Sequence, residues 1–178
     1  LMNVVLLNGS PAVKSHTRGT LNYLEQIFKS QRHEAIIIDL VNFGLPVNNP
    51  IYHADAMLSD NEKVREFAQI IKDADLVVLG TPLYHGTFSG LLKSALDNLD
   101  GPALEGKKIL LCSNSSGPRN AVQASQQLVI VARTMGGEVH NSVIGTCKAD
   151  HTETENSYEL TSDEIKTRCE KIISELTE

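Results

Sequence analysis

Short runs of β-branched and aliphatic residues alternate along this chain with longer stretches that have helical spacing. This alternation is typical of βαβ units, in which helices connect the parallel strands of one sheet. Three of the runs are almost continuously apolar, as expected for strands that helices cover on both faces. The sequence therefore predicts an α/β protein with strands at 3–7, 35–40, 75–80, 108–112 and 139–145.

The stretches between these runs carry the signals of helices. Leu92, Leu96 and Leu99 stand at i, i+4 and i+7 and are expected to face the sheet. Ser59-x-x-Glu62 and Thr161-x-x-Glu164 have the pattern of capping boxes, which mark helix starts. The predicted helices are 17–30, 61–72, 89–99, 119–135 and 163–176. Two long connections, 41–58 and 148–160, are expected to be loops. The acidic run 151–156 of the second loop is expected to be exposed to solvent.

Length and composition limit the possible partners. The 178 residues, 41% of them apolar, fit one domain over 1–178. The net charge of −6 opposes binding to nucleic acid or acidic membranes, and no apolar run approaches the roughly 20 residues that span a bilayer. Three cysteines without CxxC spacing, and histidines without ligand spacing, favour neither disulfides nor a metal. We therefore expect a cytoplasmic protein with no export signal, metal, nucleic-acid or membrane partner.

The segment 8–17 connects the first predicted strand to the first predicted helix. In a doubly wound sheet this turn lies at the edge where ligands bind. It carries three hydroxyl side chains and ends at a helix N-terminus, whose free amides favour an anion. It is neither a Walker A loop nor a GxGxxG turn, so it indicates a phosphate-binding loop of another kind, or simple helix capping by Ser15 or Thr17. The candidate residues are Ser10, Pro11, Ser15, His16 and Thr17.

A second loop, 81–90, leaves the third predicted strand. Pro82 keeps the preceding residue extended, and Gly86 lets the backbone approach a ligand closely. Tyr84 and His85 are candidate contacts to a flat ring, with packing and solvent exposure as the alternatives. Because the carboxyl ends of parallel strands meet at one edge, this loop and 8–17 are predicted to form two walls of one crevice.

With these two loops the sequence resembles the NAD(P)H-dependent FMN reductases of the flavodoxin-like superfamily, in particular the branch that includes flavin reductases of sulfonate-utilising systems. The resemblance covers about residues 2 to 146. It rests on Gly9-Ser10-Pro11 and on 81–93, which is similar to the family's TPxYxxxxSGxLK segment. It implies a flavodoxin-like three-layer sandwich, with a five-stranded parallel sheet in the order 2-1-3-4-5 and helices on both faces.

The resemblance also implies where FMN binds. The hydroxyls of the first loop would hold the phosphate, 82–86 would line the isoalloxazine, and 113–117 would form a third wall. Ala124-Ser125-Gln126 stand about where some sulfonate-system members have a Tyr linked to flavin release, which leaves open whether FMN is retained or released. The implied residues of the second and third walls are Pro82, Leu83, Tyr84, His85, Gly86, Ser113, Asn114, Ser115, Ser116 and Gly117.

The implied reaction is hydride transfer from NADPH or NADH to FMN, followed by electron transfer to free flavin, a quinone, an azo compound or a metal ion. This chemistry needs stacked rings rather than an acid or base, so no catalytic side chain is expected. A flavodoxin-type electron carrier and a flavin-binding regulatory protein are the alternatives. Such carriers commonly cover both flavin faces with aromatic rings, and 113–117 contains none. Cys112 and Arg119 have six residues between them, one more than in the Cys-x5-Arg loop of tyrosine phosphatases, so the sequence does not indicate a phosphatase.

The stretch 119–135 is apolar on more of its circumference than one sheet face requires. Some of this surface is expected to contact another subunit, and a twofold dimer is the usual outcome. The resemblance likewise implies a homodimer or homotetramer.

Overall fold

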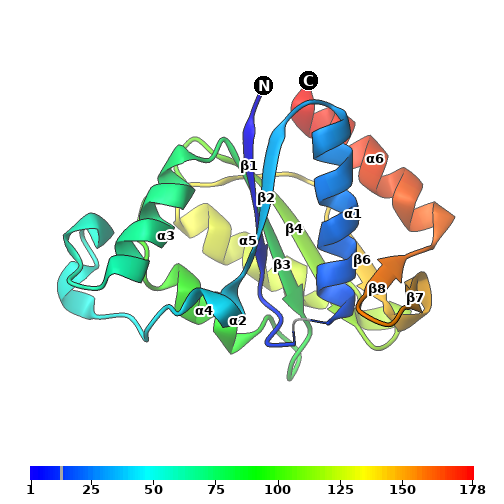
Figure 1. The fold of residues 1–178 in the computed structure, drawn as a ribbon, viewed down its shortest axis with the longest axis horizontal. Helices are drawn as coiled ribbons and strands as arrows, with labels where there is room; N and C mark the ends of the chain where they lie inside the picture. Colours follow the sequence, from blue (N-terminus) through cyan, green and yellow to red (C-terminus); the bar gives the residue numbers. More distant parts are fainter. Residues whose placement is uncertain (13) are drawn as a thin grey trace.

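The computed structural model describes residues 1–12 and 14–178 and shows helices packed on both faces of a central sheet (Figure 1). The first four strands are β1 (Asn3–Asn8), β2 (Glu34–Asp39), β3 (Leu76–Pro82) and β4 (Lys108–Ser115). All their pairings are parallel, and with β5 (Glu138–Val139) the sheet runs β2-β1-β3-β4-β5. The predicted fold class and strand order are therefore confirmed.

The fifth position of the sheet holds two short strands instead of one. β5 (Glu138–Val139) and β6 (Ile144–Cys147) both pair with β4 in parallel, so the strand predicted at 139–145 is interrupted. Between the two, the His140 ring nitrogen Nδ1 accepts a hydrogen bond from the Ser142 amide at 3.1 Å. This local bond gives the Ser142 amide a partner other than β4, which explains how the strand is interrupted here.

Helices cover the two faces of the sheet unequally. On one face lie α1 (His16–Ser30) and α6 (Asp163–Thr177), and on the other α3 (Glu62–Asp73), α4 (Gly90–Leu96) and α5 (Gln123–Thr134) (Figure 1). A single turn, α2 (Leu40–Phe43), follows β2, and short 3₁₀ turns occur at 50–52, 56–58, 118–120 and 148–150. Within 1–12 and 14–178, no helix is both long enough and apolar enough to cross a membrane.

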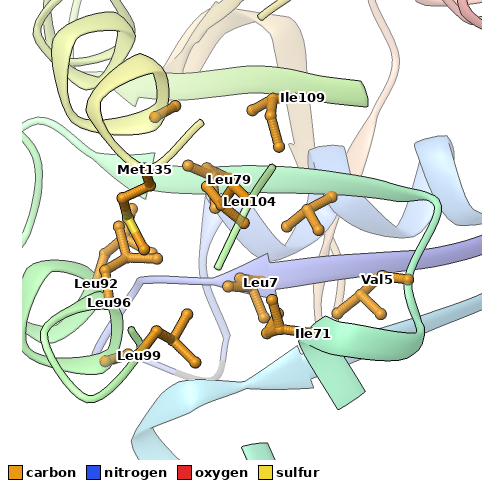
Figure 2. Packing of buried hydrophobic residues seen from close by; sticks show 14 of the residues in the cluster. Val5, Leu7, Ile71, Leu79, Leu92, Leu96, Leu99, Leu104, Ile109 and Met135 are labelled. Carbon is orange, nitrogen blue, oxygen red and sulfur yellow. The ribbon is translucent and has the colours of Figure 1, made fainter. Parts of the chain in front are cut away.

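Alternating side chains of each strand divide the core into two layers. Val5 and Leu7 of β1 pack with α3, α4 and α5, whereas Val4 and Leu6 pack with α1 and α6. Figure 2 shows the first of these layers, in which Leu92 of α4 points toward the sheet as predicted. The period of two along a strand sends neighbouring residues to opposite faces, which is why the strand sequences are apolar throughout.

The predicted capping boxes are wrong by one or two residues. Asn61 caps α3 by accepting from the amides of Lys63 and Val64, and Ser162 caps α6 by accepting from Ile165. The Ser59 hydroxyl accepts from the Asn61 amide instead, and so shapes the turn before the helix. Asn61 and Ser162 are as suitable for capping as the predicted Ser59 and Thr161, so the sequence pattern alone does not determine which residue caps the helix.

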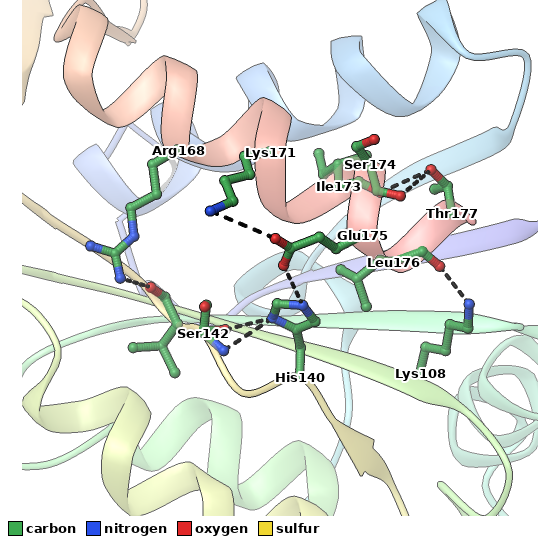
Figure 3. Close-up of polar contacts among 11 residues, drawn as sticks. Lys108, His140, Ser142, Arg168, Lys171, Ile173, Ser174, Glu175, Leu176 and Thr177 are labelled. Atoms are coloured by element: carbon green, nitrogen blue, oxygen red, sulfur yellow. Dashed lines mark hydrogen bonds and ion pairs between the residues drawn. The ribbon is translucent and has the colours of Figure 1, made fainter.

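Polar contacts attach α6 to the sheet (Figure 3). The Lys108 ammonium at the start of β4 donates to the Leu176 carbonyl at 2.6 Å, and Arg168 donates to the Val143 carbonyl at 3.1 Å. Glu175 Oε2 lies 3.1 Å from His140 Nε2. These bonds connect the last helix to β4 and to the segment between β5 and β6.

The connection predicted as a loop at 148–160 contains a β-hairpin. β7 (His151–Glu153) and β8 (Tyr158–Leu160) pair antiparallel and lie beside the N-terminal half of α1 (Figure 1). Gly19 of α1 is the contact point, because a Cβ there would lie 2.0 Å from the Tyr158 carbonyl oxygen. Glu153 is exposed as expected, but His151 is half-buried and its Nε2 lies 2.9 Å from Thr20 Oγ1. The hairpin therefore docks on α1.

We predict that Gly19→Ala lowers the free energy of unfolding by about 1–3 kcal/mol, because the new methyl overlaps a backbone oxygen and the hairpin must move. Without this overlap, alanine in place of glycine in a helix interior would raise the free energy of unfolding by up to about 1 kcal/mol. Urea denaturation measures the change. Gly90→Ala in α4 is the control, since its Cβ would meet nothing within 4 Å and stability should be unchanged or slightly higher. Equal stability of Gly19→Ala and the parent would contradict this docking.

Candidate functional site

A cavity of about 430 Å³ opens at the carboxyl ends of β1, β3 and β4, at the lower edge of the sheet in Figure 1. Its volume is within the range of small-molecule sites. Segments from all three predicted walls meet there. The lining consists of Ser10, Ala12, Lys14, Ser15, His16, Thr17, Pro82, Leu83, Tyr84, Asn114, Ser115, Ser116, Asn120, Lys148 and Tyr158.

Five of the predicted site residues are not part of this lining: Pro11, His85, Gly86, Ser113 and Gly117. Val13, inside the first loop, lies outside the described residues. Sequence reasoning missed Ala12, Lys14, Asn120, Lys148 and Tyr158 as lining residues. The last two belong to the segment after residue 146, where the resemblance ends.

The N-terminus of α1 forms one end of the cavity. Ser15 is its N-cap, and the hydroxyl oxygen accepts from the Arg18 amide at 3.0 Å, so the capping interpretation of Ser15 is confirmed. Capping uses an oxygen lone pair and leaves the hydroxyl hydrogen able to donate to an anion. The first turn of α1 contains no acidic residue. The helix dipole and its free amides therefore favour a phosphate at this end.

The cavity lining is basic although the protein is acidic. It contains Lys14, Lys148 and His16 but no Asp or Glu among the described residues, while the whole chain has a net charge of −6. Burial, His151 and the Lys148 ammonium together hold the pKa of His16 below its usual value of 6.5. His16 is thus neutral at pH 7 and can donate one hydrogen bond. The positive charge of the lining comes from the two lysines, of which Lys14 is paired with Glu153, a residue outside the lining.

The β7–β8 hairpin closes one side of this basic end. The Tyr158 ring stacks on His16 with a centroid distance of 4.0 Å and an interplanar angle of 26°. Lys14 Nζ lies 5.3 Å from the Tyr158 ring centroid and 2.9 Å from Glu153 Oε1. The hairpin thereby holds one of the two lysines and one ring of the lining in place.

Hydrogen bonds join the three walls to one another. The Ser89 hydroxyl, at the start of α4, donates to the Gly9 carbonyl at 2.6 Å and connects the second wall to the first. The Leu83 amide donates to the Asn114 carbonyl at 2.8 Å and connects the second wall to the third. Gly9 has no room for a side chain, because a Cβ would lie 2.8 Å from the Gly80 carbonyl oxygen. The crevice is therefore largely formed before any ligand enters.

The second wall ends in a two-residue turn. The Tyr84 amide donates to the Thr87 carbonyl at 2.9 Å, and the Thr87 amide donates back at 3.0 Å. His85 and Gly86, between them, have φ angles of 50° and 80°. Positive φ at both central residues is the geometry of a type I′ turn, which favours glycine at the second position. Gly86 therefore occupies the position of the turn at which positive φ favours glycine.

Ser113 has a structural contact in the third wall. It is buried, and its hydroxyl donates to the Ala121 carbonyl at 2.5 Å and accepts from the Ser125 hydroxyl at 2.9 Å. Ser113 thus attaches the segment before α5, and α5 itself, to the end of β4. Asn114, Ser115 and Ser116 reach the cavity from the same segment.

Cys112 lacks the properties of a phosphatase nucleophile. The thiol is 1% exposed, and burial raises its pKa well above the usual range. A nucleophilic thiolate needs the opposite shift, toward lower pKa, and access to its substrate. The near-match of Cys112 and Arg119 to a phosphatase loop therefore has no counterpart in the structure.

The chain is similar in sequence or structure to several flavin-dependent oxidoreductases. A family model described as NADPH-dependent FMN reductase matches residues 2–150. The FMN-dependent NADPH-azoreductase of Staphylococcus aureus (strain USA300) is 32% identical over 178 residues, covering 98% of this chain and 93% of the relative.

Two solved structures have the same fold. The flavoenzyme NAD(P)H:(acceptor) oxidoreductase FerB from Paracoccus denitrificans has a TM-score of 0.75 and 19% identity, covering 98% of this chain and 96% of that one. The FMN-dependent NADH-azoreductase from Bacillus anthracis, in complex with FMN, has a TM-score of 0.73 and 16% identity, covering 99% and 100%. At these identities the two structures establish the fold alone.

Proposed function

Because this chain belongs to the NADPH-dependent FMN reductase family, we propose that its cavity binds FMN and that NADPH reduces the bound flavin. A small-molecule electron acceptor is then the second substrate. When bound, FMN supplies the redox chemistry, accepting a hydride from the nicotinamide and passing two electrons to the acceptor.

One observation carries the assignment of the cavity. Its described lining combines a helix N-terminus, hydroxyl side chains and two lysines and contains no carboxylate, although Lys14 is paired with Glu153 outside the lining. A phosphate carries up to two negative charges and needs donors, and this set supplies both hydrogen-bond donors and positive charge. The donor set of the cavity therefore fits the phosphate end of FMN.

We assign each wall one task. Ser10, Ser15 and Thr17, with the amides of α1, bind the phosphate. The 82–86 segment would line the isoalloxazine ring and offer backbone groups to its polar edge, and 113–117 would limit the ring from the other side. No side chain needs to exchange a proton, so the work of the protein is to orient the ring and leave one face open to nicotinamide.

Anaerobic mixing of FMN-loaded protein with NADPH tests this function. The reductase account predicts rapid loss of flavin absorbance. An electron carrier or a regulatory flavoprotein would bind FMN but leave its absorbance unchanged on the same timescale, and that result would overturn the proposal. Steady-state assays with NADPH and NADH would then compare the two donors.

We propose an azo compound or a quinone as the acceptor, with free flavin and metal ions as alternatives. The support is the Staphylococcus aureus relative, an FMN-dependent NADPH-azoreductase that aligns over almost the whole chain. The open cavity also suits a flat acceptor, since Tyr84, the aromatic residue of the second wall, is 44% exposed.

We further propose that residues 1–178 form one domain that assembles as a homodimer or homotetramer in the cytoplasm. The bonds from α6 to the sheet support a single domain. Ile130 of α5, 72% exposed, supports a subunit contact on that helix, although Leu128 and Ala132 are buried within the protomer. Three free cysteines, Cys112, Cys147 and Cys169, support a reducing compartment.

A further inference from the structure

Two glutamines of α5 hold one carbonyl oxygen of the second wall. Gln123 Nε2 donates to the Gly86 carbonyl at 2.9 Å, and Gln127 Nε2 donates to the same oxygen at 2.8 Å. The two residues are four apart, so they lie on the same face of the helix. Among the described residues, these are the only side-chain hydrogen bonds to 84–87.

The glutamines are themselves held by the third wall. The bonds of Ser113 to the Ala121 carbonyl and to the Ser125 hydroxyl fix the start of α5 against the end of β4. Close packing adds to this, because a Cβ on Gly145 would lie 2.5 Å from a methyl of Val122. A continuous set of contacts therefore runs from β4 through α5 to Gly86.

The turn needs such support. His85 holds a φ of 50°, which is unfavourable for a residue with a Cβ, and the turn is exposed at its tip. Two donors on one carbonyl oxygen fix the orientation of the peptide unit that joins Gly86 to Thr87. That peptide is part of the wall assigned to the flavin ring.

We propose that Gln123 and Gln127 are positioning residues, which set the His85-Gly86 turn in the orientation that binds the flavin ring. This inference rests on the proposed function. Neither glutamine needs to touch the ring: both act through the Gly86 carbonyl.

Methionine substitution tests the role, because it preserves length and removes the donor. Gln123→Met and Gln127→Met should each weaken FMN binding less than about threefold, since one donor remains on the carbonyl. The double variant should weaken FMN binding at least tenfold and shift the midpoint potential of the bound flavin. In the protein without FMN, the amides of 84–88 should exchange hydrogen faster in the double variant. Fluorescence titration, redox titration and hydrogen exchange measure these effects.

Gln126→Met is the matched control, because Gln126 lies on the same helix and its side chain is exposed. It should keep the affinity, potential and exchange rates of the parent. If the double methionine variant unfolds, Gln123→Glu with Gln127→Glu replaces it, since the carboxylates keep the shape but cannot donate. Gln126→Glu, which adds one of the two negative charges to the same helix, is then the charge control.

The possible results separate this inference from the function on which it rests. A parent protein that does not bind FMN overturns both. A parent that binds FMN, with a folded double variant of unchanged affinity and potential, overturns the positioning role alone. Faster hydrogen exchange at 84–88 in the double variant, with unchanged FMN affinity and midpoint potential, also overturns the positioning role. The glutamines would then only stiffen the turn.

Discussion

Gly86→Val is expected to weaken FMN binding at least a hundredfold or, at saturating FMN, to slow flavin reduction by at least that factor. Gly86 has a φ of 80°, a conformation that a β-branched residue adopts only with strain of about 1–3 kcal/mol. Its Cβ would also lie 3.3 Å from Gln123 Nε2, so the added methyls disturb the bond that holds the turn. The fold should survive, because the turn lies outside the sheet.

Substitutions in the same turn distinguish a backbone site from a side-chain catalyst. Tyr84→Phe and His85→Ala should stay within about tenfold of the parent, about 1.4 kcal/mol of barrier, since neither side chain must move a proton. Gly86→Asn should fall between the parent and Gly86→Val, because Asn tolerates positive φ. Stopped-flow reduction by NADPH compares the variants at saturating FMN. A thousandfold loss in His85→Ala, with Gly86→Val nearly normal, would contradict the backbone assignment.

The sequence predicted the layers of the fold because burial on both faces gives strands a strong local pattern. The order of the sheet came from the family resemblance and is confirmed. The pattern could not predict the break between β5 and β6, which depends on a bond from Ser142 to the ring of His140. It also missed the β7–β8 hairpin, since its polar residues look like a solvated loop until Gly19 and Tyr158 are brought together.

The location of the candidate cavity was predictable where its lining residues are contiguous in the chain. The loops around Ser15, Tyr84 and Asn114 each follow a strand, so the topology alone brings them to one edge. Lys148 and Tyr158 reach the cavity only through the docking of the hairpin on α1, which no local pattern indicates. Likewise, the glutamines of α5 look like ordinary surface residues until the distance to Gly86 is known.

The central claim is that the N-terminus of α1 binds the FMN phosphate. Hydrogen bonds to a charged group contribute about 1.5–3 kcal/mol each, so two of them amount to at least about 3 kcal/mol. Each 1.4 kcal/mol is tenfold in affinity. Riboflavin has the same ring and ribityl chain but no phosphate, so it should bind at least a hundredfold more weakly than FMN. Lys14 and Lys148 in the lining add a contribution that salt should reduce.

Titration of the purified protein with FMN and with riboflavin, followed by quenching of flavin fluorescence, measures this difference directly. The account predicts a Kd for riboflavin at least a hundred times that for FMN at low salt, with the ratio falling as salt is added. Equal affinities for the two flavins would show that the end of the cavity at α1 does not bind phosphate, and would contradict the assignment of the site.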